Sequence, residues 1–202
     1  MEFYETNRDK QAMETKKRVI EAARHIFLKN GFDKTTISQI IKEAGVGYGT
    51  AYVYFKNKDD IFVTVMEDVM AKFLKVAHQT FYPQSKEEAV EQIRSQVTDY
   101  MALAVDERAI LKIVNEAIGL SDMIASKWSE IQHKFIDGIT ADITYSQSRQ
   151  LANSAFDPAI TAKSWYAMNE TFMWHFVASQ DQELKPIVDQ LTLFYMSALY
   201  EE

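Results

Sequence analysis

Several short segments of this 202-residue chain carry residue types whose spacing could do chemistry. The first is Gly-Val-Gly-Tyr-Gly-Thr at residues 45–50. Glycine-rich loops let backbone amides cradle phosphates, but the dinucleotide-binding fingerprint needs a strand before it and a third glycine three places after the second. That third place holds Thr50, and the preceding residues have the pattern of a capped helix. We therefore do not expect a nucleotide-binding loop.

A second segment pairs Glu130 with His133, the Glu-x-x-His spacing found on the helices of di-iron bundles. Such bundles use two of these pairs and two further glutamates, whereas this chain offers one pair. Serine, histidine and aspartate are present, but no nucleophile-elbow motif accompanies them. We expect no enzyme, metal or cofactor. A helical metal enzyme using Glu130 and His133, or a helical interaction module, stays as an alternative.

Composition narrows the class further. The chain is 47% apolar and 25% charged, it has no cysteine, and it has no apolar run long enough for a membrane span or a signal peptide. A cytoplasmic globular protein without membrane contact is the expectation. Residues 1–60 carry 11 Lys and Arg against 9 Asp and Glu, a net charge of +2, whereas the remainder carries −9. This asymmetry indicates two domains, of which only the first suits a polyanion.

Apolar residues recur mostly at spacings of three and four, which predicts an all-α fold. Thr36 with Gln39 reads as a capping box, and Asp157 followed by Pro158 reads as an N-cap with proline in the first turn. Gly31 and Gly45 read as helix stops. About nine helices are expected, near residues 14–30, 37–44, 48–55, 58–80, 86–105, 107–118, 122–145, 158–179 and 186–202.

The first three of these helices suggest a helix-turn-helix, in which the second helix of the motif enters a major groove. Around that helix, Thr50, Tyr52 and Tyr54 offer hydroxyls suited to phosphate oxygens and base edges. Gly47 and Gly49 would let the backbone approach DNA closely. Val53 and Phe55 are the expected core residues of the segment.

The segment from Thr35 to Phe62, TTISQIIKEAGVGYGTAYVYFKNKDDIF, resembles the N-terminal domain of TetR-family transcriptional regulators. The resemblance implies a helix-turn-helix DNA-binding domain at residues 1–57, with a flexible arm at about 1–12. A long helix would join it to a ligand-binding and dimerisation domain at residues 58–202. Arg8 and Lys10 in the arm either touch DNA or belong to a disordered tail. The partners implied are a palindromic double-stranded DNA operator, a small-molecule inducer and a second copy of the chain.

The resemblance also implies roles for single residues. Tyr48, Gly49, Thr50 and Tyr52 sit where the family contacts bases, and Ser38 sits where it sometimes does. The positions that clasp phosphates in the family are Thr36, Tyr54 and Lys58. Many members have Ser where this chain has Gly47, and glycine is the poorer cap. We therefore expect a recognition helix that is loose at its start until DNA orders it.

The second domain is rich in large side chains, each of which either fills the core or lines a pocket. We expect an apolar or aromatic inducer, whose binding releases the protein, as a repressor, from its operator. Polar groups of Asn169, His133 or His175 would orient the inducer in its pocket. The ligand-binding candidates are Tyr100, Trp128, His133, Phe135, Trp165, Asn169, Phe172 and His175. The dimer-interface candidates are Leu191, Phe194, Tyr195 and Ala198.

Overall fold

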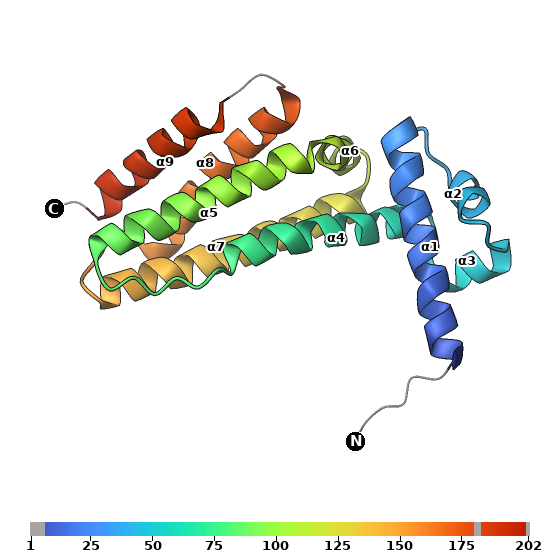
Figure 1. Ribbon diagram of the computed structural model, residues 1–202, viewed down its shortest axis with the longest axis horizontal. Helices are drawn as coiled ribbons and strands as arrows, with labels where there is room; N and C mark the ends of the chain where they lie inside the picture. The colour runs from blue at the N-terminus through green and yellow to red at the C-terminus, as the bar shows by residue number, and fades with distance from the viewer. Residues whose placement is uncertain (1–6, 180–182, 201–202) are drawn as a thin grey trace. The chain divides into compact units, whose positions relative to one another are not determined.

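The structure, a computed structural model, describes residues 7–179 and 183–200 (Figure 1). Every regular element among these residues is an α-helix, which confirms the predicted all-α class. Within this part of the chain, no helix is long and apolar enough to cross a membrane. The helices are α1 (Asn7–Asn30), α2 (Ile37–Ala44), α3 (Tyr48–Tyr54), α4 (Lys58–Ala77), α5 (Lys86–Asp106), α6 (Arg108–Ile118), α7 (Asp122–Ser148), α8 (Pro158–Ala178) and α9 (Leu184–Leu199).

The chain packs as two compact units. The head unit comprises the residues up to Asp68 together with Lys112–Trp128, and the body unit comprises Val69–Leu111 and the residues from Ser129 onward. Helices α4, α6 and α7 therefore each contribute residues to both units. These units reflect packing, whereas the predicted boundary after residue 57 concerns function, and that boundary stays a prediction.

The core of the head unit forms around one apolar face of α1. Val19, Ala23 and Phe27 on this face are fully buried, at the spacing the sequence predicted. The ring of Phe27 lies 5.9 Å from the ring of Phe32 and 4.7 Å from the ring of Phe62, centroid to centroid. These contacts join the end of α1 to the start of α4. Figure 1 shows the short helices α2 and α3 beside the long α1.

Local hydrogen bonds fix both ends of α2. At its start, the Thr36 hydroxyl accepts from the backbone N–H of Gln39, and the Gln39 side chain accepts from the N–H of Thr36, which confirms the capping box. At its end, Gly45 adopts a φ of 61°, which glycine reaches at little cost. Arg18 of α1 donates to two carbonyl oxygens at this turn, at 2.9 and 3.0 Å. The left-handed conformation of Gly45 and the hydrogen bonds from Arg18 thus together fix the turn between α2 and α3.

In the body unit, α5 packs against both α8 and α9. The start of α8 is fixed as predicted, because the Asp157 carboxylate accepts from the N–H of Ile160 and Pro158 occupies the first turn. The rings of Trp165 on α8 and Tyr195 on α9 stack with centroids 4.2 Å apart. This stack joins the last two helices of the unit.

Helix ends differ from the prediction in several places, and α9 spans Leu184–Leu199 instead of residues 186–202. α1 begins at Asn7 instead of residue 14, so residues 7–12, which were expected in the arm, are helical. The apolar stripe starts near Val19, and periodicity therefore missed the polar first turns, whose residues nevertheless favour a helix. Residues 1–6 and the side chain of Arg8 lie outside the described residues. α4 ends at Ala77 instead of residue 80, and α7 reaches Ser148 instead of residue 145.

Candidate nucleic-acid interface and ligand pocket

The outer side of α3 carries the residues for which base contacts were predicted. Tyr48 and Tyr52, one helical turn apart, expose 55% and 49% of their surface, and Thr50 is exposed as well. Two of these three side chains are tyrosines, which combine an apolar ring with a polar hydroxyl and are enriched at interfaces. Their exposure leaves a surface that is open to a partner, and their contact with bases stays a prediction.

The inner side of α3 corrects one expectation. Ala51 and Phe55 are buried, whereas Val53, predicted as core, exposes 76% of its surface. Residues 51 and 55 are four apart and form a single narrow stripe. Val53 lies two positions from each, which places it on the opposite side of the helix. A helix of seven residues buries only one such stripe.

The two glycines of α3 are not required by the packing of the chain. A β-carbon added at Gly49 would meet no atom within 4 Å, and one added at Gly47 would make only an ordinary contact with Thr50. Gly47 begins the helix without any side-chain cap, as expected. Glycine inside a helix costs about 1 kcal/mol relative to alanine, and no neighbouring atom requires a small residue at position 49. The packing of the protein therefore does not explain why residue 49 is glycine.

The residues predicted to contact phosphates differ in how exposed they are and in whether their polar groups already have a partner in the protein. Thr36 and Ser38 are exposed at the start of α2, although the Thr36 hydroxyl is already engaged in capping. Tyr54 is half-buried at the end of α3. The Lys58 ammonium donates to the carbonyl oxygens of Phe32 and Asp33, at 2.9 and 3.1 Å. Lys58 therefore holds the chain between α1 and α2, and a phosphate would have to share its charge.

The same two peptide groups are gripped from the other side by Glu116 of α6. Its carboxylate oxygens accept from the backbone N–H groups of Phe32 and Asp33, at 3.2 and 3.1 Å. Two features favour glycine at position 31. Its φ is 79°, which other residues rarely adopt, and an added β-carbon would lie 3.1 Å from a Glu116 oxygen. We call Lys58, Glu116 and the two peptide groups the clamp. It sits where the chain leaves α1 for the helix-turn-helix.

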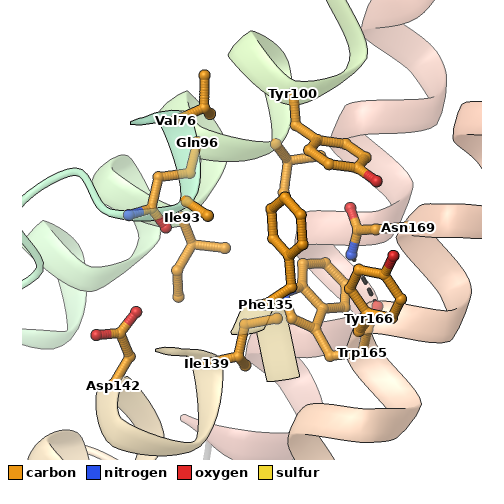
Figure 2. Close-up of a pocket in the computed structure, with 12 residues that line it drawn as sticks. Val76, Ile93, Gln96, Tyr100, Phe135, Ile139, Asp142, Trp165, Tyr166 and Asn169 are labelled. Carbon is orange, nitrogen blue, oxygen red and sulfur yellow. Dashed lines mark hydrogen bonds between the residues drawn. The ribbon is translucent and has the colours of Figure 1, made fainter. Parts of the chain in front are cut away.

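A pocket lies inside the body unit, among α4, α5, α7 and α8 (Figure 2). Its cavity volume is about 70 Å³, whereas small-molecule sites usually measure about 300–1,000 Å³. A drug-sized ligand would therefore enter only if lining side chains moved. The lining residues are Val76, Ala77, Ile93, Gln96, Val97, Tyr100, Phe135, Ile139, Asp142, Trp165, Tyr166 and Asn169.

Four of the eight ligand-binding candidates, Tyr100, Phe135, Trp165 and Asn169, line this pocket. The other four do not. Trp128 is buried within the head unit, and Phe172 is half-buried with its ring edge-on to that of His175, 6.5 Å away. His133 and His175 are exposed, and Nδ1 of His133 lies 2.6 Å from the backbone oxygen of Ser129.

The pocket also contains residues that the sequence did not single out, namely Gln96, Asp142 and Tyr166. A signal for Asp142 was present, because it follows Ile139 by three residues and Phe135 by seven, on the same helical stripe. Gln96 similarly interrupts the stripe of Ile93 and Tyr100. A polar residue on an otherwise apolar stripe is the pattern that would have found both.

Some polar groups of the pocket are held by neighbours. The Asn169 amide donates to the backbone oxygen of Trp165 at 2.9 Å, and the Tyr100 hydroxyl donates to the sulfur of Met173 at 3.2 Å. Burial raises the pKa of Tyr100 well above its usual range, so the hydroxyl stays neutral. Burial also raises the pKa of Asp142, to about 7. The Nε2 atom of Gln96 is buried without a hydrogen-bond partner.

The predicted dimer face divides into inner and outer residues. Leu191 and Tyr195 are buried against the core of their own body unit, whereas Ala198 is exposed and Phe194 exposes 62% of its surface. Phe194 and Ala198 line a hollow of mainly apolar residues together with Ile160, which exposes 70%. Only Phe194 and Ala198 among the four candidates are therefore open to a partner.

Among the described residues, no group of three or more histidine, aspartate or glutamate side chains is placed to hold a metal ion. Glu130 and His133 are both exposed on α7. The Glu-x-x-His spacing thus lies on an outer surface of the helix, which gives the metal alternative no support from geometry.

Two family models match the chain. Residues 19–65 match the model of bacterial regulatory proteins of the tetR family, and residues 93–201 match the C-terminal domain of the transcriptional regulator EthR. The second match covers more than half of the chain. Together they take in the helix-turn-helix and most of the body unit.

Similar solved structures show the same fold. They include a SmeT–triclosan complex, with a TM-score of 0.78, 18% identity and coverage of 94% of this chain and 93% of that one. The regulator FadR of Bacillus subtilis in complex with stearoyl-CoA has a TM-score of 0.70 and 20% identity, over 90% of this chain and 97% of that one. Salmonella enterica GusR has a TM-score of 0.74 and 16% identity, over 91% and 94%.

Curated relatives are regulators too, but the match covers them only in part. The fatty acid metabolism regulator protein of Bacillus subtilis (strain 168) is 27% identical over 128 residues, 61% of this chain and 65% of that protein. The regulator AcrR of Shigella flexneri is 26% identical over 106 residues, 52% and 49%. The chain thus spans less than two thirds of these relatives. With the fold and both family matches in agreement, the chain belongs to the TetR family of transcriptional regulators and is not an enzyme.

Proposed function

We propose that this protein is a dimeric repressor that binds a palindromic DNA operator through α3 and leaves it when a small molecule enters the body pocket. The base-reading residues are Tyr48, Gly49, Thr50 and Tyr52, and Ser38 lies close enough in sequence to assist. Thr36, Tyr54 and the remaining N–H of Lys58 contact phosphates. DNA and a small organic ligand are the two partners, besides the second copy of the chain.

The observation that supports this proposal best is the surface of α3. Tyr48 and Tyr52 are large side chains that stay about half exposed, and Gly49 between them has no packing reason to be small. A helix that enters a major groove needs hydroxyls and apolar groups for base edges, and a small residue where its backbone comes closest. The exposed side of α3 offers both.

Release by ligand follows from the continuity of two helices. α4 lines the pocket through Val76 and Ala77, and α7 lines it through Phe135, Ile139 and Asp142. Both helices also carry residues of the head unit. Because the cavity is small, a ligand displaces one or both helices, and a coupling of about 1–3 kcal/mol between the sites is typical of such regulators.

A selection experiment tests the proposal. Purified protein is incubated with a pool of random DNA, the retained sequences are determined, and affinity is then measured by fluorescence anisotropy at several salt concentrations. We expect a palindromic consensus. Thr50→Ala should change the preferred bases, whereas Tyr54→Phe should weaken all sequences alike. Retention of no sequence above the random pool would contradict the proposal.

Repression is tested separately by transcription in vitro from a promoter that contains the selected operator. Transcript levels should fall as the protein is added. A rise in transcript would leave DNA binding intact and would show an activator instead.

A further inference from the structure

One charged side chain, the carboxylate of Asp142, stands among the residues that line the body pocket. No lysine, arginine or histidine stands among these lining residues. A second acid, Glu170, lies behind the wall, where it accepts from the Tyr166 hydroxyl at 3.3 Å and from the Gln132 amide at 2.8 Å. A ligand that brings a negative charge would meet no counter-charge here.

Asp142 lies in this pocket without a partner. Its carboxyl makes no hydrogen bond or ion pair with any residue that the structure describes. Figure 2 shows it rising from α7 toward Gln96 and Ile93 of α5. Burial of an unpaired carboxylate is costly, and its consequence is the pKa of about 7. A neutral side chain would suit a purely structural position better.

The remaining walls suit an organic cation as well. Phe135, Trp165 and Tyr166 present aromatic rings in the same cavity, and Tyr100 packs edge-on to Phe135 with centroids 6.0 Å apart. Aromatic faces attract cations by about 0.5–2 kcal/mol, more where water is excluded. The buried Nε2 atom of Gln96 would in addition donate to an acceptor on the ligand, since it has no partner in the chain.

We propose that the body pocket binds a hydrophobic organic cation, with its ammonium group at Asp142 and its apolar part among Phe135, Trp165 and Tyr166. This inference rests on the proposed function in that it names the class of inducer. It departs from the stearoyl-CoA found in the FadR complex, because an anionic ligand finds no basic group in this lining.

Three probes of similar size but different charge test the inference. Benzyltrimethylammonium is the cation, neopentylbenzene is its neutral isostere, and 3-phenylpropionate is the anion. Binding to the 202-residue chain is measured by equilibrium dialysis without DNA. The cation should bind at least about 10-fold more tightly than the neutral isostere, a difference of about 1.4 kcal/mol. The anion should bind more weakly than either.

Two variants locate the charge. Asp142→Asn should remove the preference for the cation while leaving the affinity for neopentylbenzene within about twofold. Asp137→Asn, on an exposed position of the same helix, should behave as the wild type. Thermal unfolding of both variants checks that they fold. Equal affinities for cation and isostere in the wild type, an unchanged preference in Asp142→Asn, or no binding of the cation at millimolar concentration would each overturn the inference.

The failure of this inference differs from the failure of the proposed function. DNA retention is measured with and without each probe. Release of DNA by the neutral or anionic probe alone would preserve ligand-responsive regulation and refute the cation site. Binding of the cation at Asp142 without any effect on DNA would preserve the site and refute its role in release.

Discussion

At the scale of one residue, substitution of Gly49 should affect protein stability and DNA affinity in opposite directions. Gly49→Ala removes a glycine from the first turn of α3, and the added methyl group meets no atom within 4 Å. We expect the free energy of unfolding to rise by up to about 1 kcal/mol, while operator affinity falls because the added methyl group keeps the backbone from the groove. Thermal unfolding and fluorescence anisotropy measure the two effects.

A matched control exists in α7. Gly138 also has no neighbour within 4 Å of an added β-carbon, and it lies in the body unit. Gly138→Ala should stabilise the protein similarly and leave operator affinity unchanged. An unchanged operator affinity in Gly49→Ala would refute a close approach of the α3 backbone to DNA.

Asp142 should make stability depend on pH in a defined direction. Its pKa rises from an ordinary value of 3.8 to about 7 on folding, so the folded chain holds a proton that the unfolded chain has lost. The contribution of this residue to stability is therefore lost as pH rises from about 4 to 7. Asp142→Asn should be more stable than the wild type at pH 8, and the difference should vanish near pH 4.

Chemical denaturation at several pH values measures this difference. His78, which lines a neighbouring cavity with Asp142, is unchanged in both proteins, as are Tyr145, Tyr195 and Tyr200 nearby. Their contributions to stability are therefore the same in both proteins to first order. A difference that does not vary between pH 4 and 8 would show that the carboxyl is solvated in the folded state.

Residue identity alone predicted exposed positions better than pocket positions. Tyr52 and Tyr54 are two residues apart and cannot share one helical face, so at least one of them was expected to leave the core, and the structure exposes Tyr52. The pocket was harder, because aromatic residues at helical spacing fill cores and cavities alike. Trp128 and Trp165 look equivalent in the sequence, yet one lies in the head unit and the other lines the pocket.

At the scale of elements, the clamp joins three helices that are distant in sequence. Glu116→Ala would remove one part-buried and one exposed hydrogen bond to backbone N–H groups, at a cost of about 0.5–1.5 kcal/mol. Because the clamp holds the segment between α1 and α2, affinity for all DNA sequences should fall. Asn115→Ala, at the exposed neighbouring position, is the control and should change neither property. Thermal unfolding and anisotropy provide both readouts.

The two roles of Lys58 can be told apart in the same way. If it contacts a phosphate, Lys58→Ala should lower the salt slope of DNA binding by about one unit. If it acts only through the clamp, the slope stays the same, and the combined loss in Lys58→Ala with Glu116→Ala differs from the sum of the single losses. Additive losses with an unchanged slope would refute both roles.

Helix starts were predictable because they carry local chemistry. Thr36 and Asp157 each accept a hydrogen bond in the first turn of the helix that follows, as the sequence indicated, and Ser85 does the same at the start of α5. The start of α1 was missed because no apolar stripe runs through its first turns. The clamp could not be predicted, since 84 residues separate Phe32 from Glu116 and no local pattern links them.

At the scale of the whole molecule, the exposed apolar surface of α8 and α9 predicts the assembly. Phe194→Asp should weaken dimerisation by about 2 kcal/mol or more, the size of loss seen at interface hot spots. Operator affinity should fall about 100-fold with it, since each head then binds alone. Light scattering after size exclusion and anisotropy measure the two effects.

Leu120→Asp, at an exposed apolar position of the head unit, is the control. A dimer that survives Phe194→Asp would place the interface elsewhere.

The division into units was beyond prediction from the sequence. Charge and motifs separate residues 1–60 from the rest, but packing also brings Lys112–Trp128 into the head unit. Ser121 donates to Asp59 at 2.7 Å, and Lys127 pairs with Glu67 at the same distance. These contacts depend on the fold of α4 against the α6–α7 turn, which no local pattern specifies.

Trp165 gives the protein a built-in optical reporter. Its indole lines the ligand cavity, stacks on Tyr195, and also borders the hollow that contains Phe194. With Trp128 and Trp174 replaced by phenylalanine, emission would come from this indole alone. Its wavelength would respond to an occupied cavity, and its anisotropy decay would respond to subunit association. One unlabelled sample could then show whether the two events occur together or in sequence.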